Sequence, residues 1–387
     1  MKSVFRKIAP VIALMLMSVA MPVRAEEQPI DSARQAELWQ QPDFVRAYYV
    51  VAEPGGALYS VFGHACLHMV CPAYNLDYFF SYESEDAASK FLSFLTGKLH
   101  MGMRAMTAEE YLDDFRDAQR GVKEYELLLP IEQKRELWRV LDEKAAEGML
   151  LPYDYEARGC AYACVQILEE ALGADQIQYG EWSPRFNRSR REITNDYIKH
   201  TYPWNLLVLN TVVGAEFDNV NSPEEKLVMP MEVAEVWQQA KVRGEYMLSR
   251  EPHELLPSAQ RHERPWFTPM MAALILLLLS ILSWFTDKPY IDWLILGIVT
   301  LEGAVVTYLV VVSSLPCTGW NWLIIPYNIL PAICWRWRRY WALPFAVVVG
   351  VWALCMLAWP FLLTDNALVV VAIAWMIVLI KTRYEKD

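Results

Sequence analysis

The chain has 387 residues, of which 55% are hydrophobic, and a formal net charge of −11 at pH 7. Because it has no excess of positive charge to neutralise phosphates, we expect no nucleic-acid partner. Residues 26–260 form an acidic, aromatic-rich stretch, whereas the sequence from Trp266 to Ile380 is almost continuously apolar. This division predicts a soluble domain, large enough for one buried core or two closely packed lobes, attached to a polytopic membrane region.

Residues 1–25 have the pattern of a cleavable signal peptide. Three basic residues precede an apolar run from Ile8 to Val19, and Val23-Arg24-Ala25 then offers small residues at a cleavage site. A retained signal anchor is the alternative, although the apolar run is short for a membrane span. We therefore expect an exported domain over residues 26–250.

The exported domain opens with a pattern typical of two strands and a turn. Residues 48–51 and 58–70 mix apolar and β-branched side chains, and the segment Glu53-Pro54-Gly55-Gly56 between them is a strong turn signal. His64 follows Gly63 on or beside the second strand, where the missing glycine side chain permits another group to approach closely.

Two helices are predicted in the middle of this domain, over residues 107–118 and 131–146. Thr107 is suited to cap the first helix, and Glu110 stands three residues further on, which is the spacing of a capping box. The chain has no internal repeat with a period of about 20–50 residues and no low-complexity tract. A repeat architecture is therefore not expected.

Cys160 is predicted to stand at or near the N-terminus of a further helix. It follows Gly159, and the apolar side chains after it recur with helical spacing at Ala161, Cys164, Val165, Leu168 and Leu172. The free N–H groups and the dipole of a helix N-terminus stabilise a thiolate, and the same N–H groups can supply an oxyanion hole.

Together, His64 and Cys160 are the minimum equipment for covalent acyl transfer, because they supply a base and an intrinsically good nucleophile. Two other interpretations stay open at this point. Cys160 lies in exported sequence with Cys66, Cys71 and Cys164, and four cysteines there can form two disulfide bridges. A lone histidine is also more often a hydrogen-bonded core residue than a catalytic base.

Residues 251–265, which contain prolines and charges, predict a connector to a membrane domain over residues 266–387. Apolar windows long enough to cross a bilayer predict five spans, at about 266–286, 291–313, 319–335, 341–362 and 366–381. The inner loop at 336–339 carries three arginines, whereas the outer loops at 313–318 and 363–366 carry no lysine or arginine. This asymmetry indicates a cytoplasmic C-terminus.

Three polar residues stand inside the predicted spans. Glu302 lies near the middle of the second span, where an ionisable group is costly enough to suggest a function. Asn321 and Asn328 are seven positions apart and would share one face of a helical third span. Hydrogen bonds between helices explain these two residues about as well as recognition of a lipid headgroup does.

A series of short motifs extends in one order through the mature chain. They are Pro54-Gly55, Ser60-Val61-Phe62-Gly63-His64, Asp77, Phe91, Gly97, Arg120, Tyr125-Glu126-Leu127, Tyr155, Cys160-Ala161, Pro203-Trp204, Gly214, Asp218, Ser313-Ser314-Leu315-Pro316, Asn321-Trp322 and Pro326-Tyr327-Asn328. In this order, and with the apolar region attached, the sequence resembles the Lnb-type lipoprotein N-acyltransferase family. The chain departs from that family at two positions: Gly159 replaces the usual Asn, and Leu315 replaces a frequent His.

The resemblance implies an α+β fold in which residues 26–250 form a permuted papain-like domain, as in NlpC-type hydrolases and lecithin:retinol acyltransferase. It implies that Cys160 is the nucleophile, that His64 is the base and that Asp77 orients the imidazole. An ordinary strand-edge or turn carboxylate would explain Asp77 nearly as well. The candidates for substrate binding are Gly63, Gly159, Asn321 and Asn328.

The implied activity is transfer of a fatty acyl chain, through a thioester on Cys160, to the α-amine of a diacylglyceryl-cysteine lipoprotein. The acyl donor would be a phospholipid or an ester of the lipoprotein itself, and the bilayer would be a further partner. No cofactor and no metal ion are expected. The implied location is the bacterial inner membrane, with several spans and the N-terminal domain in the periplasm. Two other classes stay open: a peptidoglycan amidase or endopeptidase of the NlpC type, and a non-enzymatic membrane protein stapled by disulfides.

Overall fold

The computed structural model of the chain describes residues 39–148, 151–154, 159–219, 227, 229–259, 265–286, 289–358 and 366–382. The chain divides into two compact units, Met1–Phe44 and Val45–Asp387, and the fold described below is that of the second unit. The predicted signal peptide, Tyr155 and most of the predicted outer loop at 363–366 lie outside the described residues.

Among the described residues, seven strands form one antiparallel sheet in the order β10, β5, β1, β2, β3, β4 and β6. In that order they comprise His253–Leu256, Val122–Glu126, Arg46–Ala52, His64–Cys71, Leu76–Ser84, His100–Met106 and Leu151–Pro152. A smaller sheet contains β7 (Ile177–Gln178), β8 (Lys241–Val242) and β9 (Glu245–Tyr246). The two predicted strands correspond to β1 and β2, although residues 58–60 form a 3₁₀ turn before β2 begins.

The helices of this sheet-rich region are α3 (Phe91–Leu95), α4 (Ala108–Asp117), α5 (Ile131–Glu147), α6 (Cys160–Leu172), α7 (Arg190–Ile198), α8 (Pro203–Val212) and α9 (Pro230–Trp237). The predicted capping box is confirmed at the start of α4. The Thr107 hydroxyl accepts a hydrogen bond from the Glu110 N–H at 3.3 Å, and the Glu110 carboxylate accepts one from the Thr107 N–H at 2.9 Å. Helix α6 begins at Cys160, as its apolar spacing predicts.

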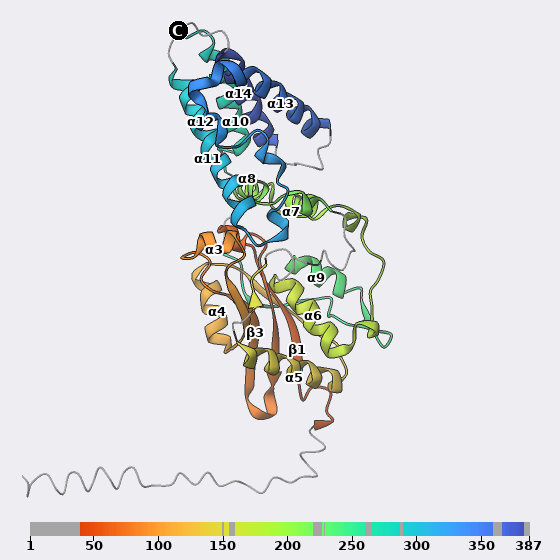
Figure 1. The fold of residues 1–387 in the computed structure, drawn as a ribbon. Coiled ribbons are helices and arrows are strands. Elements are labelled where there is room, and N and C mark those ends of the chain that lie inside the picture. Colours follow the sequence, from red (N-terminus) through yellow and green to blue (C-terminus); the bar gives the residue numbers. More distant parts are fainter. Residues whose placement is uncertain are drawn as a thin grey trace, which may run out of the picture. The chain divides into compact units, whose positions relative to one another are not determined.

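Alternation along the strands divides the side chains between two faces of the large sheet. Val50, Cys66 and Phe79 point to the face that α4 covers. The neighbouring Tyr49 points to the other face, where its ring meets that of Trp237 in α9 at 4.8 Å. Helices α5 and α6 pack against each other and against this sheet (Figure 1). The sheet-rich region is therefore α+β, with helices on both faces of an antiparallel sheet.

The edge strand β10 differs from the sequence prediction. Residues 253–256 lie inside the predicted connector at 251–265, yet they pair with Val122–Glu124 of β5. Charged residues and prolines around this segment are typical of a linker. Its pairing partner β5 lies far earlier in the chain, so the local sequence of residues 253–256 does not indicate a strand. The described part of the predicted connector thus contributes a strand to the large sheet.

The C-terminal part of the chain is helical. Its helices are α10 (Pro269–Ser283), α11 (Tyr290–Val312), α12 (Leu330–Ile333), α13 (Arg338–Ala358) and α14 (Asn366–Thr382). Within the described residues, Tyr290–Val312 and Trp335–Ala358 are long and apolar enough to cross a membrane, and α10 and α14 are shorter apolar helices. The Lys381 ammonium at the end of α14 lies 2.7 Å from the Asp292 carboxylate at the start of α11.

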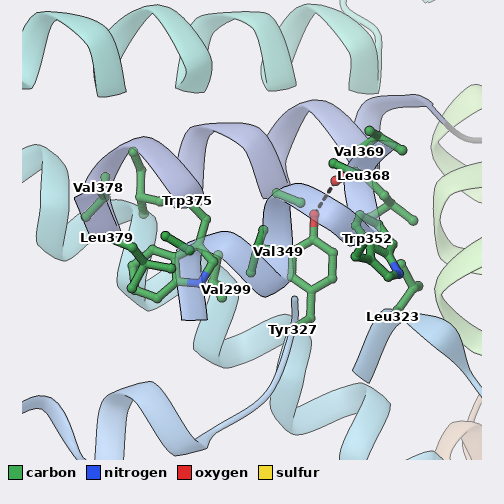
Figure 2. Close-up of a cluster of buried hydrophobic side chains, with 14 of the residues drawn as sticks. Val299, Leu323, Tyr327, Val349, Trp352, Leu368, Val369, Trp375, Val378 and Leu379 are labelled. Carbon is green, nitrogen blue, oxygen red and sulfur yellow. Dashed lines mark hydrogen bonds between the residues drawn. The ribbon is translucent and has the colours of Figure 1, made fainter. Parts of the chain in front are cut away.

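A buried apolar cluster holds these helices together. Its side chains come from α11, α13, α14 and the 3₁₀ turn η8 (Trp322–Ile324), and Figure 2 shows Val299, Val349, Trp352 and Trp375 among them. The Tyr327 hydroxyl reaches into this cluster and donates a hydrogen bond to the Leu368 carbonyl of α14 (Figure 2). Because this hydroxyl has a partner, the cluster can bury the whole ring.

Residues 319–335, predicted as a helical third span, form only short helical turns: η8, α12 and the first residue of the 3₁₀ turn η9 (Trp335–Trp337). The prediction of one helix was wrong because Pro326 and Pro331 lack the N–H that an interior helical position donates. The two asparagines shape the turns: the Asn321 side chain accepts from the Leu323 N–H at 3.0 Å, and that of Asn328 accepts from the Leu330 N–H at 3.1 Å. They do not share one helix face.

This irregular segment nevertheless runs along α11 from its C-terminal end toward its N-terminal end. The Asn328 backbone lies against Gly303 so closely that a Cβ on Gly303 would be 2.5 Å from the Asn328 Cα. Further on, the Trp335 ring lies 5.7 Å from that of Trp293, in the first turn of α11. The irregular segment is thus packed closely against α11 at both of these points.

Candidate active site

The position of His64 is fixed by the turn before it. Gly63 has a φ of +85°, and a Cβ there would lie 2.5 Å from the carbonyl oxygen of Ala52. Only glycine adopts this conformation and tolerates this contact without strain. The turn makes His64 the first residue of β2, and it places its imidazole at the end of the strand.

The imidazole of His64 is held by two side chains of β3. Its Nε2 lies 2.7 Å from the Ser81 hydroxyl and 3.4 Å from the Glu83 carboxylate. The Ser81 hydroxyl donates its hydrogen to Glu83 at 2.6 Å, so its oxygen is the acceptor toward His64. This arrangement puts a proton on Nε2 and leaves Nδ1 for another partner.

We assign Cys160, the first residue of α6, as that partner. The His64 imidazole and the Cys160 thiol are close enough to shift each other's pKa, and the backbone N–H of Ala65 also favours the thiolate of Cys160. Strand β2 and helix α6 therefore meet where the strand and the helix both begin. The two residues that sequence analysis singled out as base and nucleophile lie next to each other.

The electrostatics of this pair favour a thiolate beside an imidazolium. Burial alone would lower the pKa of His64, but the charge and hydrogen bond of Cys160, together with Glu83, raise that pKa to about 10. Burial alone would raise the pKa of Cys160, but the charge of His64 and the hydrogen bonds from His64 and Ala65 outweigh it and lower that pKa. A pKa moved down for the thiol and up for the imidazole is what an activated cysteine requires.

Two other thiols lie near Cys160 and have the opposite character. Cys66 is fully buried, and burial raises the pKa of its thiol well above the usual value. Burial also raises the pKa of Cys164, one helical turn after Cys160. All seven cysteines of the chain are free thiols in the structure. Of these three neighbours, Cys160 alone has the environment of a nucleophile.

The resemblance implied that Asp77 contacts His64, but in the structure it does not. The Asp77 carboxylate lies 2.8 Å from Nε2 of a different histidine, His68. The strand register explains this, because β2 and β3 pair with Leu67 opposite Phe80. His64 lies three residues before Leu67, and Glu83 lies three residues after Phe80, so the antiparallel register places these two opposite each other. Asp77 lies three residues before Phe80, toward the other end of the strand pair. The expected contact of Asp77 with His64 is therefore wrong, and the side chains that contact the His64 imidazole from β3 are Ser81 and Glu83.

A largely apolar pocket opens beside Cys160. Its cavity volume is about 110 Å³, and the cavity is open to solvent. Its lining residues are Leu58, Tyr59, Phe62, Gly63, Phe94, Leu95, Tyr153, Gly159, Cys160, Arg190, Thr194, Leu209, Val212, Phe217, Met229 and Pro230. Gly63 and Gly159, both predicted to bind substrate, thus lie at the pocket. Among the described residues that line it, Arg190 is the charged one.

The other two predicted substrate-binding residues lie elsewhere. Neither Asn321 nor Asn328 lines the pocket beside Cys160. The Asn321 amide donates to the carbonyl of Thr211 in α8 at 2.8 Å, and the Asn328 amide donates to the carbonyl of Ile325 at 3.1 Å. Glu302 accepts a hydrogen bond at 2.6 Å from the Thr211 hydroxyl. These three polar residues join backbone segments and helices to one another.

Sequence reasoning missed Ser81 and Glu83. They stand two residues apart in Phe80-Ser81-Tyr82-Glu83, a spacing that puts both side chains on one face of a strand. That spacing is a usable signal only once β3 is known to pair with the strand that carries His64. Arg190 and Thr194 were missed as well, because they reach the pocket from α7, which the sequence analysis did not predict.

Comparison with known protein families gives a match over part of the chain. Residues 37–187 match the family model described as the Lnb N-terminal periplasmic domain. This range contains His64, Ser81, Glu83 and Cys160, and it ends before α7. No curated protein and no solved structure matches the chain.

Proposed function

We propose that this chain, which belongs to an Lnb-type family through residues 37–187, is a cysteine-dependent lipoprotein N-acyltransferase of the bacterial inner membrane. Membership in that family supports a role in lipoprotein processing. The observation that carries the finer assignment is that Cys160, whose pKa is lowered by its neighbour His64, lies at the wall of an apolar pocket. An apolar pocket suits a fatty acyl chain, because the hydrophobic effect favours burial of each methylene group.

In the first half of the proposed reaction, His64 holds the proton of Cys160, and the thiolate attacks an ester carbonyl. The N–H groups in the first turn of α6 are suited to bind the oxyanion, since the N-cap Gly159 has no side chain to occupy them. His64 then protonates the oxygen of the departing alcohol as the carbon–oxygen bond breaks. A thioester on Cys160 is left behind.

In the second half, the α-amine of a diacylglyceryl-cysteine lipoprotein attacks the thioester carbonyl. His64 accepts the proton of this amine, the carbon–sulfur bond breaks, and the product is an amide. Cys160 returns as a thiolate beside the imidazolium of His64. Ser81 and Glu83 keep the proton on Nε2 throughout, so that Nδ1 remains the nitrogen that exchanges protons with the substrates.

The helical region supports an assignment to the membrane. Two of its helices have the length and composition of membrane spans, and the irregular segment along α11 supports a further crossing without a regular helix. With α10, α11, this segment, α13 and α14 as the five crossings, the contact of Lys381 with Asp292 would lie on the cytoplasmic side. That placement agrees with the positive-inside rule.

The test of the proposed function replaces Cys160 with Ala in cells that depend on this protein, and analyses the N-termini of their lipoproteins by mass spectrometry. We expect N-acylation to be lost, because no other nearby thiol has a lowered pKa. Cys164→Ala is the matched control, since it removes a neighbouring thiol of the same helix and should leave N-acylation in place. Unchanged N-acylation in the Cys160 variant would contradict the assignment.

The acyl donor is identified by trapping the thioester. Purified full-length protein is incubated either with phospholipid labelled in its acyl chains or with a lipoprotein labelled in its ester chains. Label on Cys160 from the first mixture alone indicates a phospholipid donor, and label from the second alone indicates the lipoprotein. A peptidoglycan amidase of the NlpC type also uses a cysteine and a histidine. If this protein were one, it would release muropeptides from purified cell wall, and Cys160 would take up label from neither the phospholipid nor the lipoprotein.

A further inference from the structure

Helix α3 carries apolar side chains on two sides. Phe94 and Leu95 line the pocket beside Cys160, while Phe91 and Leu92 are 42% and 62% exposed. The helix has Ser93 as its polar residue and no charge. An exposed helix of a soluble domain normally places charged or polar residues on its outer side. The outer side of α3 therefore has the composition of a surface that something apolar covers.

Helix α8 has the same property. Its residues Leu209 and Val212 line the pocket, while Trp204 and Val208 are each 39% exposed. The whole helix, Pro203–Val212, contains no charged residue. Two separate helices thus form walls of the pocket with one set of apolar side chains and present a second set outward.

Both helices are fixed at the same end of the apolar helices. The Ser314 N–H, two residues after the end of α11, donates to the Thr96 carbonyl just after α3 at 3.1 Å. The Trp204 indole of α8 donates to the Phe267 carbonyl, two residues before α10, at 2.9 Å. Since α10 and α11 are consecutive helices, the start of α10 and the end of α11 lie on one side of a membrane that both helices cross.

The depth of the two helices points to lipid as what covers them. Phe94 and Leu95 pack in one cluster with Leu309, which lies within the last turn of α11. The outward side of α10 is itself apolar, with Leu274 and Leu278 at least half exposed. A bilayer that surrounds α10 and α11 would therefore extend to the outer sides of α3 and α8. Tryptophan, such as Trp204, is enriched at this level of a membrane.

We propose that α3 and α8 are embedded in the outer surface of the bilayer and form the entrance through which acyl chains pass from the membrane into the pocket of Cys160. This proposal rests on the proposed function and adds the route of its substrate. A lipid chain would move between the two helices without crossing water, because the pocket walls and the outer sides of these helices are both apolar.

The embedding is tested without any enzymatic readout. Leu92→Cys is introduced into full-length protein that carries Cys160→Ala, labelled with an environment-sensitive fluorophore and reconstituted into vesicles containing lipids with a quencher near the headgroup. We expect strong quenching at position 92, and little at the matched control Glu136→Cys, where the native side chain is 43% exposed on α5. The parent protein without either new cysteine gives the background. Equal quenching at the two positions would overturn the proposal.

The route is tested with substrates of two kinds. We expect the double variant Leu92→Glu/Val208→Glu to form the Cys160 thioester with a short-chain, water-soluble ester within about twofold of the wild type. With a diacylated lipopeptide in vesicles, we expect its transfer rate to fall at least tenfold. Equal transfer by variant and wild type from vesicles would refute the entrance. If the wild type forms no thioester at all, the proposed function fails, while the quenching result still decides whether the helices are embedded.

Discussion

Two histidines of β2 face the same side of the sheet, four residues apart, and their surroundings differ in one respect on which the proposed role of His64 depends. His68 has a carboxylate on each ring nitrogen, with Glu124 2.7 Å from Nδ1 and Asp77 2.8 Å from Nε2. Its ring also stacks on that of Phe79 at 3.9 Å. His64 uses only Nε2 for its supporting partners, and its other nitrogen is left for Cys160.

The comparison teaches that a carboxylate beside a buried histidine does not identify a catalytic base. Both nitrogens of His68 are used to hold the strands β2, β3 and β5 together, because Asp77 lies on β3 and Glu124 lies on β5. A base must instead keep one nitrogen for the proton that it moves. In this protein that condition is met where β2 begins beside the N-terminus of α6.

The largest expected difference between the two histidines is in the chemical step. His64→Asn should reduce the rate of thioester formation by on the order of 10²- to 10⁴-fold, because the general base and the charge that stabilises the thiolate are both lost. His68→Asn should keep the rate within a few-fold for folded protein. It should lower the thermal unfolding temperature instead, since the buried Glu124 carboxylate loses a hydrogen bond worth about 1–3 kcal/mol.

Both variants are purified as full-length protein in detergent, and the labelled thioester and the unfolding curve are measured on the same samples. Equal losses of rate in the two variants would mean that the ring nitrogen that His64 keeps for Cys160 does not give it a role different from that of His68. Such a result would remove the basis for naming His64 the base.

A second expected effect concerns the dependence of the rate on pH. Glu83 is one of the groups that raise the pKa of His64 to about 10, so its carboxylate keeps the imidazole protonated up to high pH. Protonated His64 is needed to release the alcohol, so the rate should fall as the pH rises through this pKa. In Glu83→Gln the pKa of His64 should be lower, and the descending limb should move to lower pH.

The maximal rate of Glu83→Gln should fall less than that of the His64 variant, on the order of 10- to 100-fold, because the base remains and only its support is weakened. The pH profile of thioester formation separates this effect from a general loss of structure, which would lower the rate at every pH alike. An unchanged descending limb would show that Glu83 does not act on His64.

The difference between Glu83 and Asp77 also shows what the sequence could and could not predict. Features set by neighbouring residues were predicted and are confirmed: the capping box of Thr107 with Glu110 and the start of α6 at Cys160. The partner of His64 depends on the register between β2 and β3, which is set by packing across the whole sheet. A carboxylate two residues after Ser81 carries no sign of that register in its local sequence.

The same limit applies to the edge strand β10 and to the irregular segment at residues 319–335. Residues 253–256 become a strand only because β5 offers them a free edge. Residues 319–335 have the composition of a span, and their irregular path is possible only because the protein buries Tyr327 and supplies it with a partner from α14. In both segments, distant partners override what composition favours.

The smallest expected effect tests the role that the sequence first suggested for Asp77. Asp77→Asn should leave the rate of thioester formation and its pH profile within about twofold of the wild type, because the contact of Asp77 is with His68. The Asp77 side chain is 53% exposed, and an asparagine oxygen can still accept from Nε2, so the loss of stability should stay below about 1 kcal/mol. Glu83→Gln is the matched variant, since it makes the same chemical change on the same face of β3. A fall in rate with Asp77→Asn as large as with Glu83→Gln would show that the carboxylates of both histidines act on Cys160, and that the two sites are coupled through β2.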